Sequence, residues 1–438
     1  MKKALFFIVA LASVAIGCTK SEVIKAPGRG REIKFDTYTG KTPVTKAESV
    51  DLDYLKRALE NQGGVQVYAF LHNYIEPTTQ VPEGEEVYKG NDNYVDVSGI
   101  PTNSAYMDKT LNWVEGEADA SSHWDYPGVV YWPDYSKSRK LAFAAYALNV
   151  KDNIVWDEDP NVPYNEKSGH PEGQSYTKFT YTVPDAVKDQ KDLLVTPFLP
   201  NQGLDENANA QAVQLNLKHL LSRVGFQVVA NQDGDVQIDI KEITLYGNFP
   251  TQGKVNLKGS GVIDPITTED DANAKYVTKY DFFPTENHFV TTSSVNPVDI
   301  YENTIHTTET DIATGEVITK EETNSDNSNR FMMIMPSTQA TTGTTDAEGN
   351  VTFAEGVLPG AYIEVKYQLT DADEQIARVS LDGWKFEAGR SYTFRFKVST
   401  LSIEFDVKVD SWLEHFEETD GNGNLANGDG TYTLMPIA

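Results

Sequence analysis

Residues 392–398 read Tyr-Thr-Phe-Arg-Phe-Lys-Val, and residues 403–409 read Ile-Glu-Phe-Asp-Val-Lys-Val. Apolar and polar side chains alternate one by one in both runs. Successive side chains of a β-strand point to opposite faces of a sheet, so this alternation predicts strands that bury one face. Residues 361–369 alternate in the same way. Together the three runs predict an antiparallel sheet with one face in water.

Further strand-like runs lie N-terminal to this block. They are short and rich in β-branched or aromatic residues, and they cover residues 65–70, 141–146, 176–183, 213–217, 224–229 and 331–335. Within residues 236–245 the apolar parity slips after Ile240 and resumes at Ile243, which predicts a bulge or a bend. Helical spacing is rare, although Leu52, Leu55 and Leu59 fit one face of a short helix. The sequence therefore predicts an all-β fold.

The length of 438 residues suits about two domains of β structure. Residues 201–210 are rich in Asn, Ala and acidic side chains between two strand blocks, so we place a domain boundary there. We expect an N-terminal β-sandwich in residues 47–205 and a C-terminal one in residues 206–438. A polar stretch at about residues 307–329 predicts a long exposed hairpin or loop in the second domain.

The composition excludes several classes of protein. The chain has 37 Lys and Arg against 65 Asp and Glu, for a net charge of −28. Such an acidic chain does not predict nucleic-acid binding, because contacts with phosphates need a basic surface. A single Cys excludes a disulfide framework and a Cys-rich metal site.

The N-terminus has the pattern of an export signal. Lys2 and Lys3 precede an apolar run at residues 4–16, which is shorter than the ~20 residues that a membrane-spanning helix needs. Residues 1–17 are therefore predicted to be a signal peptide. Cys18 follows Gly17 as in the lipobox of bacterial lipoproteins, in which the Cys is acylated after cleavage. The alternative is a simple secretory signal with an incidental Cys.

Residues 18–46 form a distinct leader. The first 46 residues carry nine basic and three acidic side chains, whereas the rest of the chain is strongly acidic. A basic segment near a terminus is usually a solvated tether. This one also contains a strand-like run at residues 33–38, in which Ile33 and Phe35 fall on one face.

Signatures of enzymes and metal sites do not occur. The sequence has no His-Glu-x-x-His, no Gly-x-Ser-x-Gly, no Walker loop and no dinucleotide-binding glycine motif. Its seven His residues lack the spacing of metal ligands. Residues 420–431 start like a calcium loop, but Leu425 and Thr431 stand where Gly and Glu belong. We therefore predict no enzyme activity, no metal and no cofactor.

Aromatic residues gather between Trp113 and Tyr135. Trp113, Trp124 and Trp132 are the candidates for rings that face a ligand, because exposed rings stack on sugars. Packing inside a sandwich is the favoured interpretation, since aromatic side chains dominate the energetics of protein cores.

Several segments together resemble the fimbrillin family, the lipoprotein-derived subunits of type V pili of Gram-negative anaerobes. They occur in order along most of the chain: residues 131–133 (Tyr-Trp-Pro), 141–146, 192–195, 213–224, 243–247 with Gly253, 335–336 (Met-Pro), Trp384 with 389–394, and 407–412.

The resemblance implies two transthyretin-like β-sandwich domains and export to the outer membrane surface as a lipoprotein. It further implies that an Arg- or Lys-specific surface protease removes the lipidated leader with its first strand. A strand from a neighbouring subunit then fills the open groove, in which ladder hydrogen bonds provide affinity and side-chain pockets provide specificity. Ile33 and Phe35 would belong to the displaced strand.

The resemblance also suggests where the leader is cut. The family's site often reads Thr-Arg-Ala, and residues 45–47 read Thr-Lys-Ala here, which places cleavage between Lys46 and Ala47. Arg29 and Arg31 are alternatives because Lys46 replaces the Arg. Without cleavage, the subunit would stay a lipid-held anchor or accessory component.

The C-terminal residues 432–438 are apolar and rich in β-formers, whereas free termini are usually polar. Tyr432, Leu434 and Ile437 are the candidates for a donor segment that either enters a neighbour or folds back until assembly. The sequence thus predicts a pilus subunit, more in keeping with a shaft than a tip, that mediates adhesion and binds other subunits. The alternative is a surface glycan-binding lipoprotein of a polysaccharide-uptake system.

Overall fold

The computed structural model describes most of the chain, and almost every regular element in it is a β-strand. The described residues are 31–38, 64–80, 87–90, 93–114, 123–133, 138–204, 211–230, 238–259, 261–283, 290–292, 297–300, 304–310, 317–323, 331–340, 344–345, 351–352, 359–369, 372–398, 403–411 and 432–434. Helical structure within these ranges consists of the short 3-10 helices η2 (Leu148–Asn153) and η3 (Val187–Asp189). The all-β prediction is confirmed. No helix among these residues is long and apolar enough to cross a membrane.

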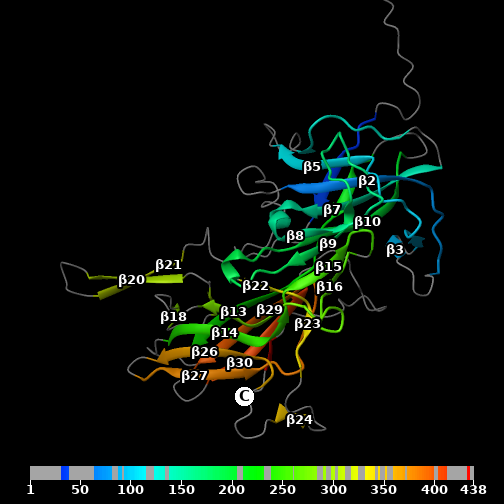
Figure 1. Cartoon of the computed structure of the whole chain (residues 1–438). Coiled ribbons are helices and arrows are strands. Elements are labelled where there is room, and N and C mark those ends of the chain that lie inside the picture. The colour runs from blue at the N-terminus through cyan, green and yellow to red at the C-terminus, as the bar shows by residue number, and fades with distance from the viewer. Residues whose placement is uncertain are drawn as a thin grey trace, which may run out of the picture.

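The first body, at the top of Figure 1, is built on a six-stranded antiparallel sheet in the order β12-β10-β7-β2-β5-β6. Its strands are β2 (Val65–Asn73), β5 (Met107–Val114), β6 (His123–Asp125), β7 (Arg139–Ala147), β10 (Leu194–Gln202) and β12 (Lys218–His219). A four-stranded sheet, β16-β15-β9-β8, packs on one of its faces. Its strands are β8 (Ile154–Glu158), β9 (Gln174–Thr182), β15 (Gln252–Asn256) and β16 (Ile263–Pro265).

The six-stranded sheet is covered on both faces. Ala142, Ala144 and Tyr146 of β7 join the core shared with β9 and β15. Leu141 and Phe143 point the other way, into a second core cluster. A strand that is buried on both sides reads as a continuous apolar run, which explains the sequence of residues 141–147.

The second body consists of two sheets that share one core. The first has the order β19-β13-β29-β30-β31, with β22 also paired to β13. Its strands are β13 (Ser222–Ala230), β19 (Val298–Ile300), β22 (Phe331–Ile334), β29 (Arg390–Val398), β30 (Ile403–Ser411) and β31 (Tyr432–Leu434). The other sheet runs β17-β14-β26-β27, with β18 also paired to β14. It contains β14 (Ile238–Pro250), β17 (Tyr276–Phe283), β18 (Val290–Thr292), β26 (Tyr362–Leu369) and β27 (Gln375–Ser380).

The three alternating runs near the C-terminus do not share one sheet, which corrects the prediction from the sequence. β29 and β30 pair with each other, but β26 belongs to the opposite sheet. β29 also pairs in parallel with β13. Alternation shows which side chains share a face, and it contains no information about the partner strand. The predicted bulge is confirmed, because the β14–β26 register shifts between Ile240 and Glu242.

The chain crosses from one body to the other more than once. β14 belongs to the second body, and β15, which starts two residues after β14 ends, pairs with β9 of the first. In β22, Met332 and Ile334 join the core of the second body, whereas Phe331 and Met333 join that of the first. Sheets of the first body thus contain residues from both sides of the predicted boundary at 205/206, and the division into two tandem domains stays a prediction.

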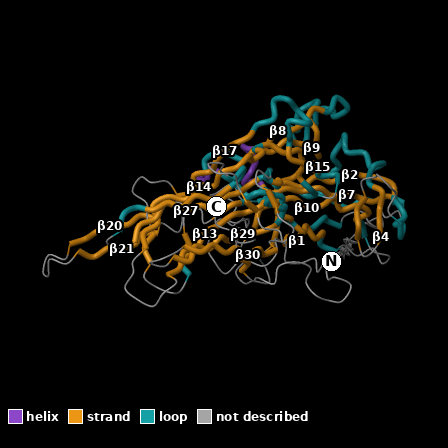
Figure 2. Tube along the Cα trace, turned by 90° about the horizontal axis from the view of Figure 1, so that it is seen from below, coloured by secondary structure: helices purple, strands orange, loops and turns teal. Residues whose placement is uncertain are grey.

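Besides the pair of β1 (Phe35–Tyr38) with β11 (Val213–Asn216), four short two-stranded pairs complete the described sheets. They are β3 (Val87–Gly90) with β4 (Asn93–Asp96), β20 (Thr304–Thr310) with β21 (Val317–Thr323), β23 (Ser337–Thr338) with β28 (Lys385–Phe386), and β24 (Thr344–Thr345) with β25 (Val351–Thr352). The β20–β21 hairpin lies in the polar stretch for which a hairpin was one expectation, and Figures 1 and 2 show it projecting from the second body. The helix predicted from Leu52, Leu55 and Leu59 lies outside the described residues.

Candidate functional site

The strand-like run of the leader lies inside the first body, on the face of the six-stranded sheet opposite β9 and β15. Ile33 and Phe35 are 0% and 5% exposed, whereas Lys34 between them is exposed. Phe35 is the first residue of β1 (Phe35–Tyr38). Figure 2 shows this strand along the same body as β2, β7 and β10. Fully burying a side chain such as Ile or Phe contributes about 1.5–3 kcal/mol. These two residues therefore stabilise the body by roughly 3–6 kcal/mol.

Hydrogen bonds hold this segment along both of its edges. On one edge, the Ile33 amide donates to the Val130 carbonyl and the Trp132 amide donates to the Arg31 carbonyl, each at 2.9 Å. These bonds form an antiparallel bridge between Glu32 and Tyr131. On the other edge, β1 pairs in parallel with β11 (Val213–Asn216). The leader strand thus fills a gap between two segments that do not otherwise pair with each other.

Aromatic rings form the floor of this gap. Phe35 makes edge contacts with Phe143 of β7 at a centroid distance of 5.6 Å and with Tyr126 at 6.0 Å. Val65 and Val67 of β2 belong to the same buried cluster. We call the space bounded by residues 130–132, β11 and this floor the leader slot. Its lining is apolar, so an empty slot would expose a continuous part of the core.

Tyr126 occupies a special position in the slot because its hydroxyl reaches the leader's backbone. The hydroxyl donates to the Ile33 carbonyl at 2.7 Å and lies 3.4 Å from the Val130 carbonyl. Burial raises the pKa of Tyr126 to about 12. Reasoning from the sequence included Tyr126 among the clustered aromatics but did not find this role. The neighbouring Pro127-Gly128 pair, which is typical of a tight turn, was the available signal.

The tryptophans of the aromatic cluster are packed. Trp124 and Trp132 are 5% and 3% exposed, so these two rings pack in the core, which was the favoured interpretation, and do not face a ligand, which was the alternative. Trp132 packs edge-on against Phe143 beneath the leader, and Trp124 packs against the partly buried Trp113. The indole nitrogens of Trp124 and Trp132 are buried and have no hydrogen-bond partner in the structure. These rings thus stabilise the slot from within.

Most of the predicted processing residues lie outside the described part of the chain. This applies to Cys18, Arg29, Lys46 and Ala47. Arg31 is described, and its side chain is exposed while its carbonyl takes part in the bridge to Trp132. Both lipidation and cleavage stay predictions.

The C-terminal segment lies on the edge of the second body. Leu434 of β31 pairs with Asp406 of β30, and Tyr432 pairs with Lys408 in an antiparallel register. The third predicted donor residue, Ile437, lies outside the described residues. The segment therefore folds back on its own chain in this state, and its transfer to a neighbour stays a prediction.

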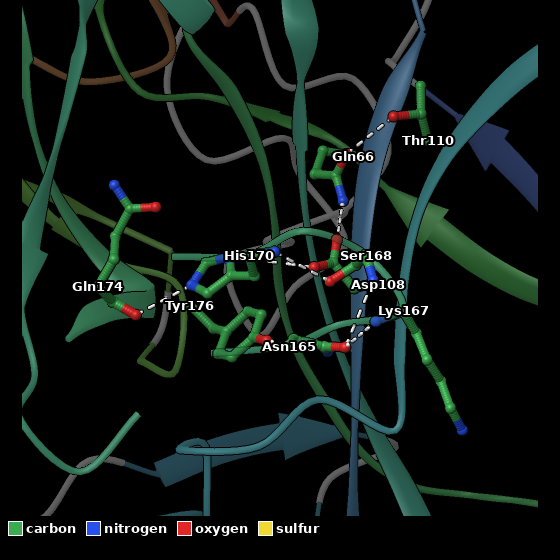
Figure 3. Close-up of polar contacts among 9 residues, drawn as sticks. All are labelled: Gln66, Asp108, Thr110, Asn165, Lys167, Ser168, His170, Gln174 and Tyr176. Carbon is green, nitrogen blue, oxygen red and sulfur yellow. Dashed lines mark hydrogen bonds and ion pairs between the residues drawn. The ribbon is translucent and has the colours of Figure 1, made fainter. Parts of the chain in front are cut away.

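A polar cluster on the first body contains Ser, His and Asp side chains (Figure 3), and the atoms that contact each other are not those of a catalytic triad. His170 Nε2 lies 2.9 Å from the Gln174 carbonyl, which requires an N–H there. Its Nδ1 is 3.9 Å from Asp108, and the Ser168 hydroxyl accepts from the His170 backbone amide instead of pairing with the ring. The imidazole stacks on Tyr176 at 3.6 Å. No nucleophile is therefore paired with a base in this cluster.

The other buried histidines have structural partners. His219 Nδ1 lies 2.7 Å from Asp192 Oδ2, and His72 bonds backbone atoms at both ring nitrogens. Burial lowers the pKa of His72. Among the described residues, no group of three His, Cys, Asp or Glu side chains is placed to hold a metal ion.

Comparisons with solved structures match fimbrial proteins at low sequence identity. A fimbrial protein from Bacteroides vulgatus is 15% identical with a TM-score of 0.48, over 87% of this chain and 99% of its own. A fimbrial assembly protein from Parabacteroides distasonis is 10% identical with a TM-score of 0.34, over 92% and 98%. The tip fimbrial protein Mfa3 from Porphyromonas gingivalis, with a C-terminal truncation, is 8% identical with a TM-score of 0.28, over 80% and 94%.

No curated protein matches the sequence. The family model described as fimbrillin-like, however, matches residues 89–412, which include most of both bodies. The chain belongs to the fimbrillin-like family.

Proposed function

We propose that this protein is a structural subunit of a cell-surface fimbria that assembles by exchanging a β-strand between subunits and mediates adhesion. The observation that carries the proposal is the burial of Ile33 and Phe35 in the leader slot. A segment from the N-terminal end of the chain completes the core of the first body, so its removal would open that core. The family and the fimbrial proteins of similar fold support a location at the cell surface.

The energetics of the slot favour exchange over permanent opening. Losing the leader would cost roughly 3–6 kcal/mol of apolar burial, which is a large share of the about 5–15 kcal/mol that stabilises a typical domain. The trimmed subunit would keep its sheets but expose apolar rings and unpaired backbone groups of residues 130–132. An incoming strand would restore both kinds of contact, and this restoration supplies the driving force for assembly.

The position of the leader strand favours one of the candidate cleavage sites. Cleavage after Lys46 would separate the whole of residues 31–38 from the body. Cleavage after Arg29 or Arg31 would leave Ile33 and Phe35 joined to the body through residues 39–63. Only the first of these cuts makes the strand removable, so we assign processing to the bond between Lys46 and Ala47.

The partners follow from this scheme. Before cleavage, acylated Cys18 would hold the subunit on the outer membrane, where an Arg- or Lys-specific surface protease acts. After cleavage, the partner is another subunit, and the C-terminal segment with Tyr432, Leu434 and Ile437 is our candidate donor. Its pairing with β30 protects that edge of the sheet until assembly.

Limited trypsin digestion of the purified chain tests the proposal. We expect a cut after Lys46, identified as Ala47 at the new N-terminus, followed by ladders of polymer on a gel. A Lys46→Gln variant should stay uncut there and form no ladders unless trypsin cuts at Lys41, Lys56 or Arg57 instead, which the new N-terminal residue reveals. The matched variant Arg31→Gln should behave like the parent. Trimmed protein that stays monomeric would contradict the proposal. Retention on immobilised polysaccharide without ladders would favour a glycan-binding lipoprotein.

A further inference from the structure

The segment Val130–Trp132, which forms one edge of the leader slot, is held from two sides. On the slot side, it bonds the backbone of the leader strand. On its outer side, the Tyr131 carbonyl accepts a hydrogen bond from the Tyr106 hydroxyl at 2.7 Å. Tyr106 does not belong to the leader, so this outer bond does not depend on whether the slot is filled.

Removing the leader strand would break its ladder with β11 and would also take the present partners from four further polar groups beside the slot. The Val130 carbonyl would lose the Ile33 amide, and the Tyr126 hydroxyl would lose the Ile33 carbonyl. The Trp132 amide and the Val213 amide would lose the carbonyls of Arg31 and Lys34. Water can solvate the groups that the empty slot exposes, but each polar group that stays buried without a partner costs about 1–3 kcal/mol, so the empty slot would tend to rearrange.

Two of these four groups can satisfy each other. The Tyr126 hydroxyl is a donor, the Val130 carbonyl is an acceptor, and they are already 3.4 Å apart. The turn between them keeps them close, because Gly128 adopts a φ of 78°, which favours glycine over other residues. A small movement of the ring would shorten this contact when the Ile33 carbonyl is gone.

We propose that Tyr126 is a latch for the leader slot, a role that rests on the proposed strand exchange. Its hydroxyl bonds the Val130 carbonyl while the slot is empty and keeps residues 130–132 in place as a docking edge. When a strand from a second copy of this chain enters, the Tyr126 hydroxyl bonds a backbone carbonyl of that strand, as it now bonds the Ile33 carbonyl. Its ring meanwhile contacts the large apolar side chain two residues further along the entering strand, as it contacts Phe35 now. Tyr126 is thus a positioning residue that reads the register of the incoming strand.

The test uses the full chain with its own leader expelled. A Phe35→Asp substitution places an unpaired charge in the apolar slot and should displace the tethered strand. A labelled peptide with the sequence of residues 31–38 is then added, and its association and dissociation rates are measured. Tyr126→Phe is introduced into this chain. The matched control is Tyr181→Phe, which removes a similar hydroxyl bond to the Lys191 carbonyl far from the slot.

The latch predicts that Tyr126→Phe slows peptide association by about tenfold, because only the outer bond from Tyr106 then holds the docking edge while the slot is empty. Tyr181→Phe should leave association unchanged. Faster dissociation with an unchanged association rate would overturn the latch, because the hydroxyl would then only stabilise a bound strand. Absence of peptide binding to the Phe35→Asp chain would also overturn it.

The latch and the proposed function fail in different ways. Ladders after trypsin treatment combined with unchanged peptide association in Tyr126→Phe would overturn the latch alone. Slower association in Tyr126→Phe without ladders from the parent chain would support the latch and overturn polymerisation by strand exchange.

Discussion

At the scale of single residues, the leader shows how alternation translates into burial. Ile33 and Phe35 enter the core while Lys34 remains in water, as the sequence pattern indicates. The surroundings of these residues could not be predicted, because the slot is made of segments that lie about 100 and 180 residues away. For Trp124 and Trp132, the sequence favoured packing over ligand binding, but only the fold shows which rings lie under the leader.

Truncating Phe35 should destabilise the uncut chain. Phe35→Ala removes ring contacts with Phe143 and Tyr126, and we expect the free energy of unfolding to fall by about 3–5 kcal/mol. Urea denaturation provides the measurement. Lys34→Ala on the same strand is the control, with an expected change within about 0.5 kcal/mol because its side chain is exposed. Equal stabilities of the two variants would show that the leader does not contribute to the core.

At the scale of elements, strands were predictable and their partners were not. The alternating runs at residues 361–369, 392–398 and 403–409 all form strands, yet β26 lies in a different sheet from β29 and β30. The bulge near Ile240 was visible because a bulge shifts the parity of apolar residues. The parallel pairing of β1 with β11 left no local signal, since parallel partners are joined by long connections and not by a recognisable turn.

Deleting residues 432–438 should abolish ladders after trypsin treatment while leaving a folded monomer. The deletion removes the candidate donor, whereas β30 keeps its ladder with β29. Circular dichroism checks the fold, and gel electrophoresis checks assembly. Replacing residues 424–430 with Gly and Ser of equal length is the control and should leave the ladders intact. Undiminished polymerisation of the deletion variant would exclude this segment as donor.

At the scale of the whole molecule, the two bodies are joined by more than a linker. The chain crosses between them at β14 and β15, and the alternating side chains of β22 enter both cores. The sequence suggested a boundary at residues 205 and 206 because the composition is polar there. Such a signal marks a loop, and it could not show that residues 252–265 return to the first body.

Shared strands should make unfolding cooperative across both bodies. We expect the urea transitions followed by tryptophan fluorescence and by far-ultraviolet circular dichroism to coincide. Most described tryptophans lie in the first body, whereas strands of both bodies contribute to the dichroism signal. A Met333→Ala variant should shift both transitions together, since this residue joins the two bodies. Two separated transitions would mean that the bodies are independent domains.

Buried tyrosines should make the protein sensitive to base. Burial raises the pKa of Tyr126, Tyr146 and Tyr392 to about 12, against about 10 for an exposed tyrosine. The unfolded chain therefore releases these protons at lower pH than the folded one. Stability should be independent of these groups below about pH 10 and should fall between about pH 10 and pH 12. This prediction would be contradicted if the tyrosinate absorbance of all tyrosines rose near pH 10 while the circular dichroism spectrum stayed native.

The slot also fixes a direction. The leader runs antiparallel to residues 130–132 and parallel to β11, so a replacement that re-forms the same bonds must run the same way. If copies join by filling this slot, every joint has the same direction along the filament, and the filament is therefore polar. One end of the filament would then carry an empty leader slot, and the other end would carry a strand that has entered no slot. Growth and capping at the two extremities would accordingly require different chemistry.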